Sequence, residues 1–91
     1  GTEYIAVRSC YVHDSSSTGI FTAHSYYPLF EYNESCYNGE HGIYQSNSGD
    51  YLTARGNVLH HNVGCGIHQN GDERYTPPGD GLISFSLVED N

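Results

Sequence analysis

Hydrophobic residues along this chain come in short clusters, and each cluster is closed by Gly, Asn, Ser or Asp. No apolar stripe recurs at the 3.6-residue period of an amphipathic helix, so the pattern favours short strands joined by tight turns. Each unit of the pattern predicts three strands. We expect the first strands at 4–7, 28–32 and 51–55, the second around Val12, Cys36 and Leu59, and the third at 19–23, 42–46 and 66–70.

A Gly-Ile dipeptide recurs at 19–20, 42–43 and 66–67, with spacings of 23 and 24 residues. Two polar positions repeat with it at intervals of 24, namely Ser9, Asn33 and Asn57, and Asp14, Asn38 and Asn62. Three strands and three turns in about 24 residues are typical of one coil of a parallel β-helix, in which stacked coils bury each other's apolar faces. The sequence therefore predicts an all-β, right-handed parallel β-helix, a single solenoid segment with coils at approximately 4–26, 27–50, 51–81 and 82–91.

Stacked coils place equivalent residues in ladders with a spacing of about 4.8 Å. We expect an inward aliphatic ladder of Ile20, Ile43 and Ile67, and beside it an outward ladder of Phe21, Tyr44 and His68. A further ladder is expected to hold His13, Tyr37 and His61, with His60 on the neighbouring one. Two imidazoles that are two coils apart are too distant to share a zinc ion without a further ligand.

The segment 71–81 departs from the repeat. Its two prolines exclude a ladder strand, so we expect a loop between the third and fourth coils. From Asn62 to Asn91 the chain runs 29 residues, which is five more than the period of 24. Such insertions in solenoids map to one face, often the binding face.

Charge and composition exclude several classes of function. The chain has 11 Asp and Glu against 3 Lys and Arg, and its formal net charge of −8 leaves no basic surface for a nucleic acid or an anionic membrane. No apolar run reaches the roughly 18 residues of a membrane span. We expect no signal peptide in this sequence, because no basic region is followed by an apolar core. Cys10, Cys36 and Cys65 have no CxxC spacing, and we expect them to be buried small side chains.

Both ends of the sequence fall inside predicted coils. We therefore expect a processed or excised piece of a longer parent chain, whose neighbouring β-helix coils are its partners. Such a piece is expected to expose its core and unpaired strand edges unless something caps them.

The units Asn57-Val-Leu-His-His-Asn62 with Gly66-Ile67, and 33–38 with Gly42-Ile43, resemble the parallel β-helix repeat of the pectate-lyase-like superfamily. The segments 41–50, 55–57, 66–72 and 79–81 are similar to bacterial right-handed β-helix repeat proteins. The resemblance covers essentially the whole chain and implies a secreted or periplasmic protein directed at polysaccharide. The superfamily contains lyases, glycoside hydrolases, uronan epimerases and non-catalytic members. The calcium-binding aspartates and the catalytic arginine of pectate lyases have no matching positions here.

Candidate catalytic residues follow the Gly-Ile strands. A polysaccharide lyase needs a base beside the uronate carboxylate and a group that neutralises this carboxylate. Tyr44 or His68 is the candidate base, and Arg55 is the candidate neutralising group. A glycoside hydrolase uses two carboxylates about 5 to 9 Å apart, and the candidates are Asp50, Asp72 and Asp80.

Substrate-binding candidates surround these positions: His41, Asn47, Asn70, Tyr75 and Asp80. No cofactor is expected; if calcium is used, Asp72, Asp80 and nearby carbonyl oxygens are the candidate ligands. Nine tyrosines suit either the stacking of sugar rings or an ordinary strand surface.

Two hypotheses remain open. The first is a segment of an extracytoplasmic carbohydrate-active protein of the lyase, hydrolase or epimerase type. The second is a non-catalytic glycan-binding or scaffold module, in which the same residues are solvated turns and a stacked aromatic ladder.

Overall fold

Short strands form three parallel sheets in a computed structural model that describes residues 4–71 and 81–91. The first sheet has the order β1 (Ala6–Arg8), β4 (Leu29–Glu31), β7 (Thr53–Arg55) and β10 (Leu87–Glu89). The second has the order β2 (Tyr11–His13), β5 (Glu34–Cys36) and β8 (Val58–His60). The third has the order β3 (Ile20–Ala23), β6 (Ile43–Asn47) and β9 (Ile67–Gly71).

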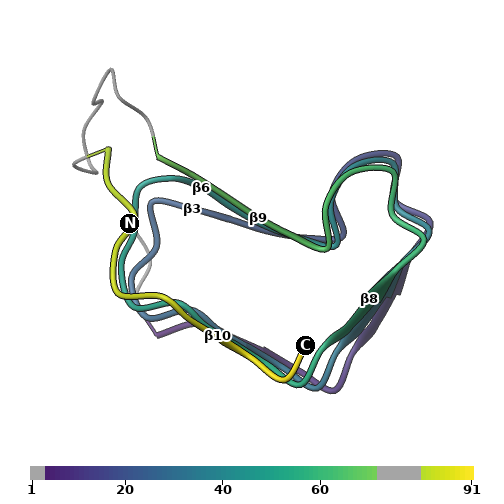
Figure 1. The fold of residues 1–91 in the computed structure, drawn as a ribbon, viewed down its shortest axis with the longest axis horizontal. Helices are drawn as coiled ribbons and strands as arrows, with labels where there is room; N and C mark the ends of the chain where they lie inside the picture. The colour runs from purple at the N-terminus through teal and green to yellow at the C-terminus, as the bar shows by residue number, and fades with distance from the viewer. Residues whose placement is uncertain (1–3, 72–80) are drawn as a thin grey trace.

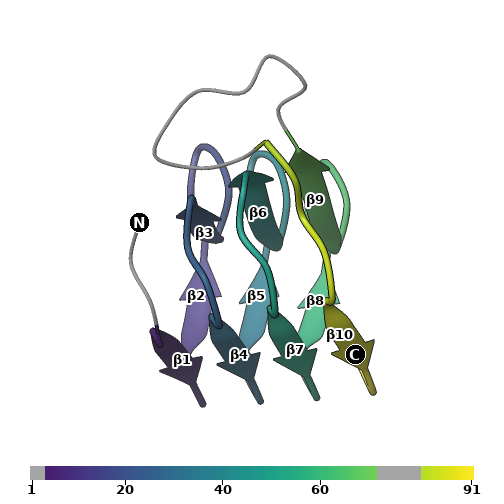
Figure 2. The same ribbon diagram turned by 90° about the vertical axis from the view of Figure 1, so that its left-hand side faces the viewer.

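Each of the first three coils contributes one strand to each sheet, and the fourth adds β10 to the first sheet. Successive coils superimpose when viewed along the stack (Figure 1). From the side, the strands of a sheet run next to one another in the same direction (Figure 2). The predicted all-β solenoid is therefore confirmed. Within the described part of the chain, no helix is long and apolar enough to cross a membrane.

The strand register confirms two of the predicted ladders and corrects a third. Ile20, Ile43 and Ile67 are partners in the β3-β6-β9 sheet, and Phe21, Tyr44 and His68 are partners at the next position. His13 was expected to align with Tyr37 and His61, but its partner is Cys36, which in turn pairs with His60.

The cause of this error is a coil spacing that is not constant. Partners in the first two coils are 23 residues apart, and from β4 and β7 onward they are 24 apart, because one residue is added between Ser46 and Thr53. The assumed spacing of 24 therefore placed the polar anchors of the first coil one residue too early. Cys10 and Ser15, not Ser9 and Asp14, occupy the places below Asn33 and Asn38.

The first strand of each coil is shorter than predicted. It has three residues, because the preceding aromatic residue takes a left-handed turn conformation instead of joining the sheet. These residues are Tyr4, Tyr27, Tyr51 and Phe85, with φ between 58° and 64°. Their rings stack at centroid distances of 4.9, 4.8 and 5.0 Å, so an aromatic column runs along the turn.

The fourth coil aligns differently from the prediction. Asn91 lies on the ladder of Asn57, 34 residues earlier, and not on the ladder of Asn62. The third coil is therefore ten residues longer than the period of 24, not five. The expected loop at 71–81 lies outside the described residues except for its two ends.

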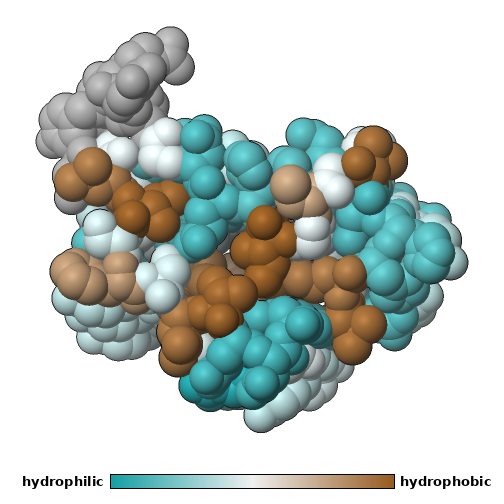
Figure 3. Space-filling model, in the orientation of Figure 1, coloured by the Kyte–Doolittle hydropathy of each residue, from teal (hydrophilic) through white to brown (hydrophobic). Residues whose placement is uncertain are grey.

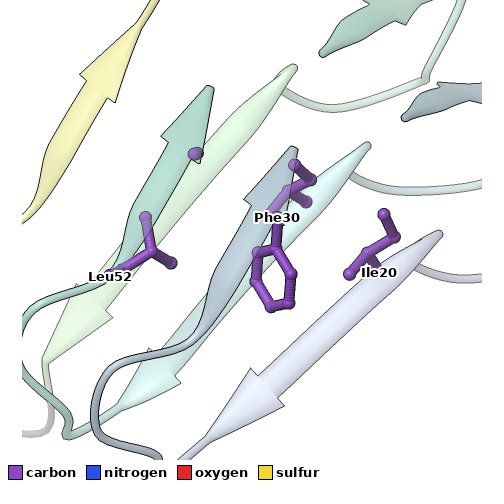
Figure 4. Packing of buried hydrophobic residues seen from close by; sticks show 5 residues of the cluster. Ile20, Phe30 and Leu52 are labelled. Carbon is purple, nitrogen blue, oxygen red and sulfur yellow. The ribbon is translucent and has the colours of Figure 1, made fainter. Parts of the chain in front are cut away.

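The apolar core is small and lies on the inner faces of the first and third sheets. Phe30, Ile43, Leu52 and Ala54 are at most 1% exposed, and Ile20 is 7% exposed (Figure 4). Val7, Val12, Leu59 and Ile67 pack against this cluster. Of the cysteines, only Cys36 is buried, whereas Cys10 and Cys65 are exposed. The expectation of three buried cysteines is wrong for these two because they lie in turns between strands.

Buried asparagine ladders close two turns of the coil. Asn57 Oδ1 accepts hydrogen bonds from the backbone N and Nδ2 of Asn33, both at 3.0 Å, and Asn57 Nδ2 donates to Phe30 O at 2.9 Å. Asn62 does the same for Asn38 and donates to Ser35 O. Each amide therefore bonds to a backbone N–H at the turn of the preceding coil and to a carbonyl of the strand before that turn, as buried polar groups require.

The glycine of the Gly-Ile repeat gives these asparagines room. A Cβ on Gly19 would lie 2.2 Å from Ser35 Oγ and 2.6 Å from Asn38 Nδ2. A Cβ on Gly42 would lie 2.9 Å from Asn62 Nδ2 and 2.8 Å from Gly66 O. The repeat recurs because the asparagine of the following coil packs against this Cα.

Candidate functional site

The outer face of the β3-β6-β9 sheet is an uncharged surface of rings and small polar groups. Because side chains alternate along a strand, the residues beside the inward isoleucines face out. Phe21 is 58% exposed, and Tyr44 and His68 are half-buried. Two residues further along, the same face carries Ala23, Ser46 and Asn70.

The rings on this face contact one another. Tyr44 packs edge-on against Phe21 at 5.6 Å and against His68 at 5.0 Å between ring centroids. His41, from the turn before β6, lies 5.2 Å from Tyr44 and stacks on His68 at 4.5 Å. His41 Nδ1 also accepts a hydrogen bond from Cys65 N at 2.9 Å. The structure thus brings together three predicted site residues, namely His41, Tyr44 and His68.

Asn47 and Asn70 extend the same surface toward the next turn. Asn47 pairs with Gly71, as expected. Its Oδ1 accepts a hydrogen bond from Ser46 Oγ at 3.0 Å, and its Nδ2 lies 3.4 Å from His24 Nε2. Asn70 is exposed on β9, two residues after His68. The exposed Asn70 amide is placed to hydrogen-bond a ligand that lies along the rings, whereas the Asn47 amide is engaged by Ser46 and His24.

Arg55 does not join this group. It is on β7, in a different sheet, and its Nε donates to Glu89 Oε1 at 2.5 Å while Nη1 lies 3.7 Å from Glu31 Oε2. The hydrogen bond to Glu89 and its charge raise the pKa of Arg55. Arg8 donates to the other oxygen of Glu31 at 2.7 Å. An outward ladder of alternating charge therefore runs along the first sheet, and Arg55 is engaged in it.

The candidate carboxylates are also separated from the ring cluster. Asp50 lies in the turn before β7, where its Oδ1 accepts a hydrogen bond from Ser84 N at 2.9 Å. This contact ties the third coil to the fourth. Asp72, Tyr75 and Asp80 lie outside the described residues, so their proposed roles, including that of a calcium site, stay predictions.

A second cluster of reactive side chains lies on the outer face of the β2-β5-β8 sheet. Glu34, Cys36 and His60 hold ligand atoms within 4.8 Å of one another. His60 Nε2 is 2.7 Å from Glu34 Oε2, and its Nδ1 is 2.6 Å from His61 Nδ1. A hydrogen bond to Cys36 raises the pKa of the Tyr11 hydroxyl.

Sequence reasoning missed this cluster, although the sequence holds a signal for it. Glu34 and Cys36 are two residues apart on one strand and so share a face, and His60 follows Cys36 by one coil. The assumed spacing of 24 already pairs Cys36 with His60, but the histidines were weighed as ligands only with one another.

The last described coil presents apolar surface at the end of the stack. Figure 3 shows hydrophobic residues gathered across the middle of this end face. Val88, the inward-facing partner of the buried Ala54, is 48% exposed because no further coil of the described chain covers it. A hollow of about 430 Å³ is lined by Gln69, Gly71 and 81–86. The expected packing of neighbouring coils stays a prediction.

Comparison with known families assigns the fold. The model of the family described as "Right handed beta helix region" matches residues 1–77. Searches of curated proteins and of solved structures find no significant match. The match covers most of the chain, and the stacked parallel sheets agree with it. The chain belongs to the right-handed β-helix family.

Proposed function

We propose that this β-helix segment binds polysaccharide along the outer face of the β3-β6-β9 sheet, outside the cytoplasm. The observation that carries the proposal is the contacting row of Phe21, Tyr44 and His68, which places aromatic surface and ring hydrogen-bonding groups along successive coils. Sugar rings pack on aromatic faces, while polar ring substituents and amides fix their hydroxyls. Asn70, exposed two residues after His68 on β9, supplies such an amide beside the row.

The charge distribution favours a neutral glycan. The chain has a formal net charge of −8, and a uronate polymer would be repelled by it. Arg8 and Arg55 are both paired with glutamates on another sheet, so neither is placed to bind the carboxylate of a uronate at this face. The described outward residues of β3, β6 and β9 carry no carboxylate.

The aromatic column of Tyr4, Tyr27, Tyr51 and Phe85 is a poorer sugar platform. Its rings are stacked with interplanar angles of 4° to 13°, so the faces of its inner members are already covered. We therefore assign the column to the stability of the turn and the Tyr44 face to binding.

Cleavage of polysaccharide is the second candidate function. The observation that favours it is the contact of the Tyr44 phenol with two imidazoles, those of His41 and His68, since a phenol and an imidazole serve as proton-transfer groups in such enzymes. The described residues bring neither an arginine nor a pair of carboxylates to this cluster, so the geometry supports binding more strongly than cleavage.

The test is to incubate the full chain with immobilised neutral polysaccharides and with uronic-acid polysaccharides. Retention on neutral polymers without new reducing ends supports binding. Unsaturated products or new reducing ends would establish cleavage instead. Tyr44→Ala should weaken retention about tenfold or more, whereas Tyr11→Ala, on another sheet, is the matched control. Equal retention of wild type and Tyr44→Ala would refute the assignment of this face.

A further inference from the structure

We propose that Glu34, Cys36 and His60 form a binding site for a divalent metal ion of the zinc class on the outer face of the β2-β5-β8 sheet. The site is on a different sheet from the proposed glycan face and does not depend on it. Its residues come from two strands whose register fixes them as neighbours. Ligands on paired strands are held more rigidly than ligands on loops.

The donor set suits zinc. Thiolate, imidazole and carboxylate are the three side-chain ligands that Zn²⁺ binds, at about 2.3, 2.0 and 2.1 Å. A tetrahedral ion would hold the nitrogen and the carboxylate oxygen roughly 3.3 Å apart. His60 Nε2 and Glu34 Oε2 are 2.7 Å apart, so a small opening of this pair admits the ion. Three protein ligands leave a fourth position for solvent or an external ligand.

The surroundings orient the ligands. His60 Nδ1 faces His61 Nδ1 at 2.6 Å, so a proton on either nitrogen can be donated to the other. When that proton is on His60, its Nε2 presents a lone pair toward Glu34 and Cys36, as a metal-bound imidazole requires. His61 then serves as the hydrogen-bond acceptor that commonly fixes the tautomer of a metal-binding histidine.

Cys36 has no exposed surface although its strand position faces out. Ser35, the residue before Cys36 on β5, points into the coil, where its Oγ donates a hydrogen bond to Gly42 O. Side chains of the outer face therefore enclose the thiol. Its position between the Glu34 carboxylate and the His60 imidazole does not serve to fill the core.

A second triad, His41, Cys65 and His68, also holds its ligand atoms within 4.8 Å of one another. It is less suited to a metal for two reasons. The rings of His41 and His68 are stacked with an interplanar angle of 8°, so their in-plane lone pairs run parallel and do not converge. In addition, His41 Nδ1 already accepts the hydrogen bond of Cys65 N. This triad provides the matched control.

The experiment is a titration of the full chain, with reduced thiols, with Co²⁺ as a spectroscopic probe and then with Zn²⁺ as competitor. We expect one Co²⁺ per chain, intense visible bands of tetrahedral cobalt and a thiolate-to-cobalt charge-transfer band, all displaced by Zn²⁺. Cys36→Ser should abolish the charge-transfer band, and Cys65→Ser should retain it. His61→Phe keeps a ring against Tyr37 but removes the acceptor, so affinity should fall about 10- to 100-fold.

Glu34→Gln tests the same site in case the Cys36→Ser variant misfolds, since Glu34 is exposed and its substitution leaves the core unchanged. We expect it to weaken Co²⁺ binding at least about tenfold while the circular dichroism spectrum is unchanged. The proposal is overturned if Co²⁺ does not saturate at one equivalent, or if Glu34→Gln binds like wild type. It is equally overturned if the charge-transfer band disappears in Cys65→Ser and survives in Cys36→Ser.

Discussion

Polar side chains occupy two contrasting settings in this small solenoid. The asparagine ladders inside the turns are largely buried, and their amides are bonded to backbone groups of the preceding coil. The cluster of Glu34, His60 and His61 on the outer face bonds mainly to itself, side chain to side chain. The first arrangement satisfies groups that folding removes from water, whereas the second leaves donor atoms directed at one another. The difference separates polar residues that specify the fold from those available for a ligand.

The largest effect is expected from removal of a buried ladder amide. Asn57→Ala leaves the backbone N of Asn33 and the carbonyl of Phe30 without partners in a buried turn. Each such group costs about 1–3 kcal/mol, so we expect a loss of roughly 3–5 kcal/mol in the free energy of unfolding, measured with urea.

The control for this substitution is Asn62→Ala, which removes equivalent bonds in a half-buried position. Its loss should be about half as large, because water reaches the freed groups. Equal losses of unfolding free energy for the two variants would show that burial of a ladder amide does not determine how much it contributes to stability.

The second effect tests the space beside the ladder. Gly42→Ala forces a Cβ to within 2.8 Å of Gly66 O and 2.9 Å of Asn62 Nδ2. Overpacking of this kind costs about 1–3 kcal/mol of unfolding free energy. Gly66→Ala is the matched control, since its Cβ would meet nothing nearer than Leu59 Cβ at 3.5 Å. Thermal unfolding of both variants checks the prediction, which fails if Gly42→Ala is as stable as Gly66→Ala.

The third effect concerns the charge ladder of the first sheet. Glu31 lies between Arg8 and Arg55, and its side chain is 14% exposed. Glu31→Gln should lower the free energy of unfolding by about 1 kcal/mol at low salt. In about 1 M salt the loss should shrink, because screening weakens the pairs. Glu89→Gln, which disrupts the pair with Arg55 alone, should cost less; a larger cost would contradict the ladder.

The smallest effect is expected in the outer cluster. Without metal, Glu34→Gln should change the free energy of unfolding by no more than about 0.5 kcal/mol, because exposed ion pairs contribute little. Urea unfolding with and without Zn²⁺ sharpens the contrast, since a bound ligand stabilises only the folded state. A loss of several kcal/mol in the absence of metal would place Glu34 among the residues that specify the fold.

The sequence was sufficient to predict the solenoid, because Gly-Ile recurs at a fixed point of the coil and its ladder partners are those expected, Ile20, Ile43 and Ile67. It did not reveal that one residue is added between Ser46 and Thr53, since a turn absorbs an extra residue without changing any apolar pattern. That single residue displaced His13 from its true partner, Cys36. Tyr44, His41 and His68 were grouped correctly, whereas Arg55 was not. Arg55 follows the Gly-Ile strand in the sequence, but it belongs to the first strand of the next coil, which lies in another sheet.

The alternating order Arg8, Glu31, Arg55 and Glu89 constrains how such a protein can grow or shrink by whole coils. Deleting the second coil would set Arg8 against Arg55, and duplicating it would set two glutamates side by side. Opposite neighbours are preserved only when coils are gained or lost two at a time. The charge ladder on the first sheet therefore tolerates the gain or loss of coils in even numbers and penalises odd numbers, even though the strands of successive coils pair in the same parallel way.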